Sequence, residues 1–210
     1  MSLEEGIQLI IRFEAAGSEA KYLQLHIERP TWPRGSSGVT IGIGYDLGYN
    51  SASQIRTDWS GHLDAQTIER LASCSGTTGA AAGSLITGLR DIIVPWSAAI
   101  AVFRERSIPH YMNLTTSAFP GVDAVDPRCQ GALLSLVYNR GTRMTDRAGF
   151  PGERKEMRAI RGLVPNKDYK QIASEIRSMK RLWIGTANEK GLSRRRDAEA
   201  DLVLMSLSDH

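Results

Sequence analysis

Apolar residues recur at helical spacing over most of the chain. Residues 2–16 place their apolar side chains on one face, and Ser2 can cap this helix with Glu5 as its reciprocal partner. The same spacing predicts further helices, most of them with a proline at or near a boundary. They cover residues 63–72, 80–89, 95–116, 127–141, 152–164, 168–183 and 193–207.

Residues 36–51, SSGVTIGIGYDLGYNS, break this pattern. Apolar residues alternate there with threonine and glycine, which predicts a strand whose Val39, Ile41 and Ile43 face the core. The glycines would leave the opposite face bare, so that a ligand could approach the backbone. The alternative is that these glycines mark turns.

The predicted elements form an α+β protein, mainly helical. We expect a single domain over residues 1–210. A small β-containing lobe would cover about residues 16–60, and a larger helical lobe would cover residues 1–15 and 61–210. A cleft between lobes is a frequent place for a ligand site.

Charge is unevenly distributed, although the net charge is only +3. Between Arg140 and Arg196, Lys and Arg exceed Asp and Glu by ten, whereas the rest of the chain has seven more acids than bases. A basic face of this kind can meet an anionic cell wall or a nucleic acid, or it can be a solvated helical surface. No nucleic-acid-binding motif is present, so nucleic acid is not expected as a partner.

Several classes of site are not expected. Cys74 and Cys129 are interpreted as two separate thiols, and the four histidines are scattered, so no metal site is predicted. The acidic N-terminus lacks the features of a secretory signal, and no apolar run is long enough for a membrane helix.

Glu14 follows the apolar run of the first helix, in IIRFEAAG. A carboxyl group beside apolar neighbours loses hydration, which suits a general acid at neutral pH. The alternative is an exposed glutamate near a helix C-terminus.

Thr40 and Asp46 are the candidates in the glycine-rich segment. The Thr40 hydroxyl could hold a water, and a turn after the strand could bring the Asp46 carboxylate to the same water. The alternative for Asp46 is a turn residue. Two carboxylates flanking a cleft suggest glycoside hydrolysis.

Four motifs in order resemble phage-type lysozymes of glycoside hydrolase family 24, and most closely their pesticin-like muramidase subtype. They span residues 9–199, nearly the whole chain. They are LIIRFEAAG with Glu14, GVTIGIG with Thr40, ALLSLVYNRG with Asn139 and Gly141, and GLSRRRDAE with Gly191, Leu192, Arg195, Arg196 and Glu199. Most phage enzymes place an aspartate between the glutamate and the threonine, whereas the pesticin-like subtype carries it six residues after the threonine, as Asp46 is here. Glu28 is the reserve candidate for this second role.

The resemblance implies a lysozyme-like fold and an N-acetylmuramidase that cleaves the β-1,4 bond between N-acetylmuramic acid and N-acetylglucosamine. Glu14 would protonate the leaving oxygen, while Asp46 and Thr40 hold the attacking water, with inversion at the anomeric carbon. No cofactor is implied. The resemblance makes Arg195, Arg196 and Glu199 a buried structural ion-pair cluster.

Substrate contacts are expected from Tyr45, Asn139 and Arg140. Trp32, in a proline-rich stretch, is interpreted as a packed loop residue rather than a sugar platform. The peptidoglycan glycan strand is the expected partner of a monomer, and an inhibitor or immunity protein could be a second one. We expect synthesis in the cytoplasm and action on the wall in the periplasm, after holin-type release or delivery by a secretion system.

Three other functions stay open from the sequence, of which a nucleic-acid binder is suggested by the basic segment alone and by no motif. A lytic transglycosylase needs only one acid/base carboxyl and would release an anhydro sugar. A wall-binding module of the same fold would bind without turnover.

Overall fold

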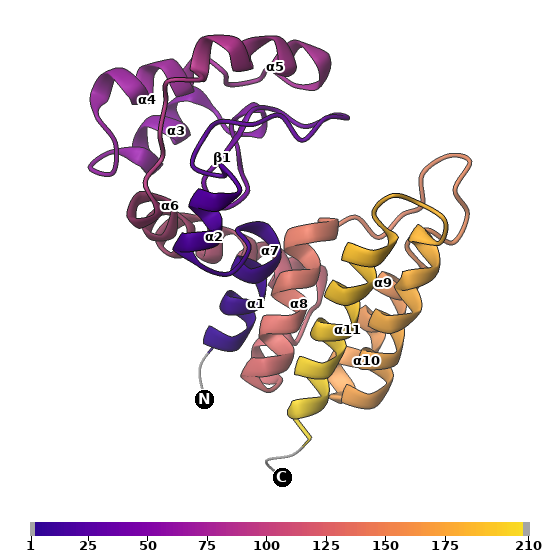
Figure 1. The fold of residues 1–210 in the computed structure, drawn as a ribbon. Coiled ribbons are helices and arrows are strands. Elements are labelled where there is room, and N and C mark those ends of the chain that lie inside the picture. The colour runs from indigo at the N-terminus through magenta and orange to yellow at the C-terminus, as the bar shows by residue number, and fades with distance from the viewer. Residues whose placement is uncertain (1–2, 208–210) are drawn as a thin grey trace. The chain divides into compact units, whose positions relative to one another are not determined.

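The computed structural model describes residues 3–207 and is mainly helical, with one small antiparallel sheet (Figure 1). This confirms the α+β class with helix predominant. Ser2, the predicted N-cap, lies outside the described residues. None of the helices in this described part is long and apolar enough to cross a membrane.

The elements follow one another along the chain, with long connections over residues 25–39 and 141–154, and all η elements are 3₁₀ turns except the π-helical η3. They are α1 (Glu4–Glu14), α2 (Glu19–Gln24), β1 (Thr40–Ile41), β2 (Tyr45–Asp46), η1 (Leu47–Tyr49), α3 (Ala52–Trp59), α4 (Ala65–Ala72), α5 (Gly79–Leu85), η2 (Ile86–Leu89), α6 (Trp96–Val102), η3 (Phe103–Ser107), α7 (Ile108–Ala118), η4 (Val122–Ala124), α8 (Pro127–Arg140), α9 (Lys155–Leu163), η5 (Val164–Asn166), α10 (Tyr169–Ser178), η6 (Met179–Trp183) and α11 (Glu189–Met205).

The described chain divides into two compact units. Residues 14–109 form one, here called the hairpin unit because it contains β1 and β2. Residues 3–13 and 110–207 form the other, here called the helical unit. Helices α3 to α6 therefore belong to the same unit as the strands.

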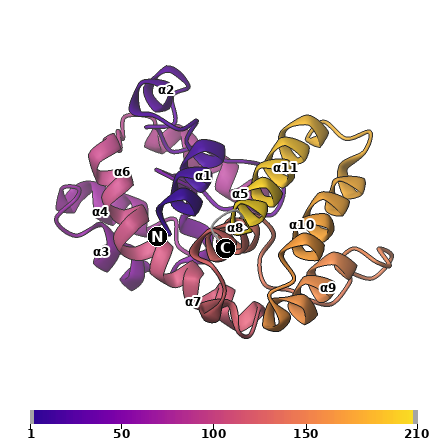
Figure 2. The same cartoon turned by 90° about the horizontal axis from the view of Figure 1, so that it is seen from below.

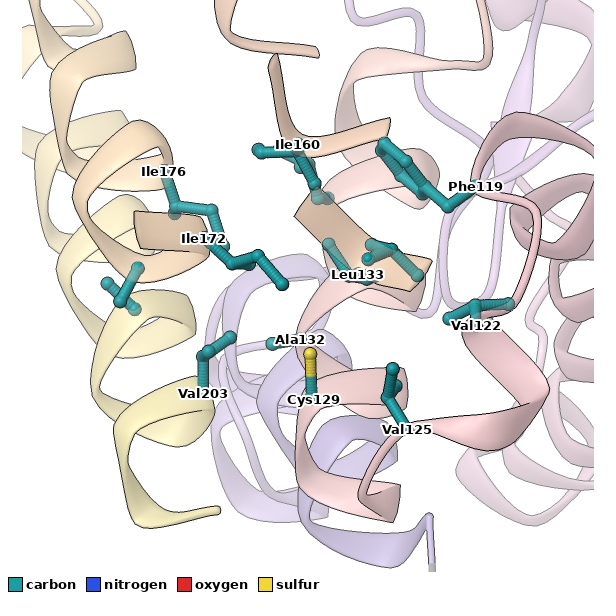
Figure 3. Close-up of a cluster of buried hydrophobic side chains, with 14 of the residues drawn as sticks. Phe119, Val122, Val125, Cys129, Ala132, Leu133, Ile160, Ile172, Ile176 and Val203 are labelled. Atoms are coloured by element: carbon teal, nitrogen blue, oxygen red, sulfur yellow. The ribbon is translucent and has the colours of Figure 1, made fainter. Parts of the chain in front are cut away.

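The helical unit is built around α8, whose residues from Gly131 to Val137 are all buried. Helix α11 packs against both α8 and α10, and α10 packs against α9 (Figures 1 and 2). Apolar side chains from these helices and from the turn after α7 meet in one core, in which Phe119, Leu133 and Ile172 are fully buried (Figure 3). Each such side chain contributes about 1.5–3 kcal/mol through its removal from water.

The hairpin unit has its own core. Val39, Ile41 and Ile43 are all buried, as their alternation predicted, together with Tyr22 and Trp59. The Tyr22 hydroxyl donates to the carbonyl of Val94 at 3.0 Å, which ties α2 to the segment before α6.

The predicted strand over VTIGIG is wrong in its extent, because the chain turns within it. The backbone has positive φ at Gly42 (56°) and Gly44 (67°), so the strand ends at Ile41 and β2 returns beside it. The idea that these glycines leave a bare face also fails at Gly42, where a Cβ would meet Ala99 and Trp59 at 3.3 Å. The turn interpretation is the correct one.

The helix predictions differ from the structure in two further ways. Helices α2 and α3 were not predicted, although Ser18 and Ser51 cap them through their hydroxyls. The helix predicted over 95–116 contains the π-helical segment η3. Cys74 and Cys129 are separate, buried thiols, as expected.

Candidate active site

Thr40 and Asp46 lie directly opposite each other in the antiparallel pair of β1 and β2. Residues paired in this way project from the same face of the sheet, with Cβ atoms about 4.5–5.5 Å apart. On its other side Thr40 exchanges backbone hydrogen bonds with Thr31, at 2.8 and 2.9 Å. The hairpin thus brings two of the three candidate catalytic residues together.

The Asp46 carboxylate is half-buried and caps the turn that follows it. Its Oδ1 accepts hydrogen bonds from the backbone N–H groups of Gly38 (3.1 Å) and Gly48 (2.9 Å), and its Oδ2 accepts from Gly38 at 3.0 Å. A carboxylate can accept about four hydrogen bonds. Two N–H groups make these three contacts, with that of Gly38 shared between both oxygens, so acceptor capacity is left for a water or a substrate hydroxyl.

Both glycines at this carboxylate are required by close packing. A Cβ on Gly38 would lie 2.3 Å from Asp46 Oδ1, and a Cβ on Gly48 would lie 2.5 Å from the Thr77 carbonyl oxygen. The sequence analysis missed these two positions, although both glycines stand in the segment it singled out. Gly38 lets the backbone reach the aspartate, and Gly48 lets the backbone pass close to Thr77 and Gly38.

Glu14 is the last residue of α1 and the first of the hairpin unit. Its side chain is half-buried, and the next residue, Ala15, is fully buried. Ala16 and Gly17 then adopt positive φ, which ends the helix. The alternative of an exposed glutamate near a helix C-terminus is therefore correct in position, but the residue is half-buried rather than exposed.

Tyr45 lies in the interior of the hairpin unit, with only 7% of its surface exposed. Its hydroxyl donates to Asp58 Oδ2 at 2.8 Å, and its ring packs edge-on against Trp59. Burial and then the Asp58 carboxylate raise the pKa of Tyr45 above its ordinary value. These contacts occupy the side chain that the sequence analysis assigned to substrate.

Glu28, the reserve candidate, is buried at 7% exposure. Its Oε1 lies 3.4 Å from His26 Nδ1 and 3.7 Å from Arg29 Nε. Burial, with a smaller contribution from the Glu28 charge, raises the pKa of Tyr22. Glu28 therefore stands within the core of the hairpin unit.

Trp32 is packed, as expected. Its indole Nε1 donates to the Ser37 carbonyl at 3.1 Å, and its ring covers Gly83 so closely that a Cβ there would lie 2.5 Å from it.

Asn139 and Arg140 end α8, in the helical unit. Asn139 is exposed, and Gly141 terminates the helix at φ 69°. The Arg140 guanidinium is half-buried, with its Cζ 5.2 Å from the centre of the Trp183 ring. Trp183 could not be assigned to this site from the sequence, because 43 positions separate it from Arg140.

The GLSRRRDAE segment forms the buried cluster that the family resemblance implied. Glu199 Oε1 accepts from Arg196 Nη2 (2.8 Å), Arg195 Nε (3.2 Å) and Ser135 Oγ (2.7 Å). Arg195, Arg196 and Glu199 are each at most 3% exposed. The cluster joins α11 to α8 and is structural.

Residues 9–104 match the model of a family described as a domain of unknown function (DUF8812). The matched segment covers less than half of the chain, includes Glu14, Thr40 and Asp46, and ends within η3. No curated protein matches the chain.

Proposed function

We propose that this chain is a peptidoglycan hydrolase with a lysozyme-like fold, an N-acetylmuramidase that cleaves between N-acetylmuramic acid and N-acetylglucosamine. The observation that carries the proposal is the pairing of Thr40 with Asp46 across the hairpin, in the same compact unit as Glu14. The order of the four lysozyme-like motifs along the chain supports the same assignment.

Glu14 acts as the general acid in this proposal. It delivers a proton to the glycosidic oxygen as the bond to the sugar breaks, which typically contributes about 10²–10⁴-fold to the rate. Its half-buried position beside Ala15 limits hydration of the carboxyl group.

Asp46 and Thr40 hold the attacking water. The remaining acceptor site of Asp46 takes one water proton, and the Thr40 hydroxyl takes or gives the second hydrogen bond. Water attacks the anomeric carbon from the face opposite the leaving group, so the configuration inverts, and the two carboxyl groups would stand about 6.5–9.5 Å apart.

One observation favours a second candidate, a lytic transglycosylase. The Asp46 carboxylate already accepts three backbone hydrogen bonds, as a purely structural cap would. A transglycosylase needs no aspartate for water, because the 6-hydroxyl of the muramic acid residue itself attacks the anomeric carbon.

Product analysis separates the two reactions. Purified peptidoglycan is digested with the native chain, with Asp46→Asn and with Asp64→Asn, and the fragments are analysed by mass spectrometry. Asp64 is a matched control, because it is an exposed N-cap in the same unit and asparagine also caps helices well. We expect reducing muramic acid ends from the native chain and from Asp64→Asn, with a loss of at least about 10²-fold in Asp46→Asn.

Anhydro products, or undiminished cleavage by a folded Asp46→Asn variant, would assign the transglycosylase reaction instead. If the native chain binds peptidoglycan but does not cleave it, both enzymatic functions are wrong and the chain is a wall-binding module.

A further inference from the structure

A cavity of about 310 Å³ lies beside Arg140, entirely within the helical unit. Arginines from three different segments line it, and Phe150, Pro151, Leu182 and Trp183 form an apolar part of its wall. Glu153 is the carboxylate among its lining residues. Phe150 is 56% exposed, so the apolar wall is open to a ligand.

Arg140 lacks a carboxylate partner within the described part of the chain. Its Nη2 donates to the backbone carbonyl of Glu153 at 3.1 Å, and its guanidinium lies over the Trp183 ring. Its Nε is buried and has no hydrogen-bond acceptor among residues 3–207. Buried polar groups are nearly always hydrogen-bonded, so Arg140 is incompletely satisfied within the fold, although this Nε is itself closed to a ligand in the cavity.

A second buried guanidinium without an ion pair among the described residues stands beside it. Arg154 is 9% exposed and donates to the Arg140 carbonyl at 2.9 Å, and its own Nε also has no acceptor in the described chain. Burial, and then repulsion by Arg154 and Arg196, lower the pKa of Arg140 to about 10. The charges of Glu153 and Glu156 oppose this lowering but do not cancel it.

The other arginines of the wall are already paired. Arg147 bonds the Glu153 carboxylate at 2.8 Å, and Arg181 bonds the buried Glu156 carboxylate at 2.6 Å. Arg143 also contacts Glu153, at 2.8 Å. These ion pairs hold the arginine side chains that line the cavity. Arg140 is left as the lining cation that can pair with a ligand.

We propose that this cavity binds the carboxylate of an organic ligand, which pairs with Arg140 while its apolar part packs on Trp183 and Phe150. A guanidinium pairs well with a planar carboxylate. A compact phosphate dianion fits less well, because it has no apolar part to pack on Trp183 and Phe150, although Glu153 repels either anion. The identity of the carboxylate rests on the proposed function. If the chain cleaves peptidoglycan, the carboxylate belongs to the peptide branches of that polymer.

Binding can be measured by NMR on the full chain carrying Glu14→Gln, following the indole N–H of Trp183. The probes are N-acetyl-L-alanyl-D-glutamate and the same compound with both carboxylates amidated. We expect a saturable shift with the acid and none with the diamide. Arg140→Gln should weaken binding at least about tenfold, because a hydrogen bond to a charged group is lost.

Arg161→Gln is the matched control, because it removes an exposed charge from α9 outside the cavity and should bind as tightly as the parent. Arg140→Lys keeps the positive charge and should bind with intermediate affinity. This result would show that the loss in Arg140→Gln comes from the lost charge rather than from misfolding. The remaining amide signals of each variant show whether it is folded.

Equal shifts with acid and diamide, or equal weakening by Arg140→Gln and Arg161→Gln, would overturn the proposal. Inorganic phosphate competing as well as the acid would overturn its carboxylate specificity. Succinate binding as tightly as the peptide would keep the carboxylate site and assign it to a free small carboxylate. Since no cleavage is measured, failure here leaves the proposed hydrolase untouched.

Discussion

Single residues in this molecule are assigned to structure or chemistry by their hydrogen-bond partners. Glu199 is saturated by Arg195, Arg196 and Ser135 at its Oε1 and is wholly buried, so it supports the fold. Asp46 is half-buried and keeps acceptor capacity, so the same residue can cap a turn and hold a water. The family resemblance predicted the first correctly, whereas the second depends on N–H groups that no sequence pattern locates.

Tyr45 should make stability fall at alkaline pH. Its pKa is raised above the ordinary 10.0, so its stabilisation is complete below pH 10 and is lost as pH rises toward the folded pKa. Tyr45→Phe should therefore flatten the decline in unfolding free energy between pH 10 and 11 by up to about 1.4 kcal/mol per pH unit. Urea unfolding from pH 8 to 11 measures this decline.

At pH 8 the same variant should be less stable by about 1–3 kcal/mol, because Asp58 loses a buried hydrogen bond. Tyr49→Phe is the control, because Tyr49 is 68% exposed and its hydroxyl donates to the Ser36 carbonyl, so the substitution leaves the buried pair of Tyr45 and Asp58 intact. Identical slopes for Tyr45→Phe and the native chain would contradict the account of this buried pair.

Elements were predictable where one face is continuously apolar and a proline or capping residue stands at the boundary. Helix α8 begins at Pro127 and ends before Gly141, as its pattern indicated. The hairpin was not predictable from alternation, because positive φ at Gly42 and Gly44 converts a strand pattern into a turn. The eight-residue α3 was missed because its sequence, ASQIRTDW, carries few apolar residues.

The crossing of α1 and α8 depends on two glycines. A Cβ on Gly6 would lie 2.2 Å from the Gly131 Cα, and neither backbone can move aside without shifting a helix. Gly6→Ala should therefore destabilise the protein by about 1–3 kcal/mol or more, measured by urea unfolding.

Gly162→Ala in α9 is the matched control, because a Cβ there meets nothing within 4 Å. It should stabilise by about 0.4–1 kcal/mol, since alanine restricts the unfolded chain. Equal effects of the two substitutions would show that the close approach of α1 and α8 does not exist in solution.

For the whole molecule, the excess of positive charge in residues 140–196 could be read from the sequence. Which arginines form ion pairs could not. Arg140 and Trp183 are far apart in the chain, and the ion pairs that neutralise Arg147 and Arg181 depend on the packing of α9 and η6. The net excess of ten positive charges is therefore not a uniform basic face. Most of these arginines have carboxylate partners, whereas Arg140, which lines a cavity with Arg147 and Arg181, has no ion pair among residues 3–207.

The central claim, that Glu14 is the general acid of a muramidase, is tested most directly by the rate at which reducing ends appear in purified peptidoglycan. Glu14→Gln is compared with Glu19→Gln, which removes an exposed carboxylate five residues later. We predict a loss of about 10²–10⁴-fold in Glu14→Gln and a native rate in Glu19→Gln. A folded Glu14→Gln variant that releases reducing ends at the native rate would contradict the account.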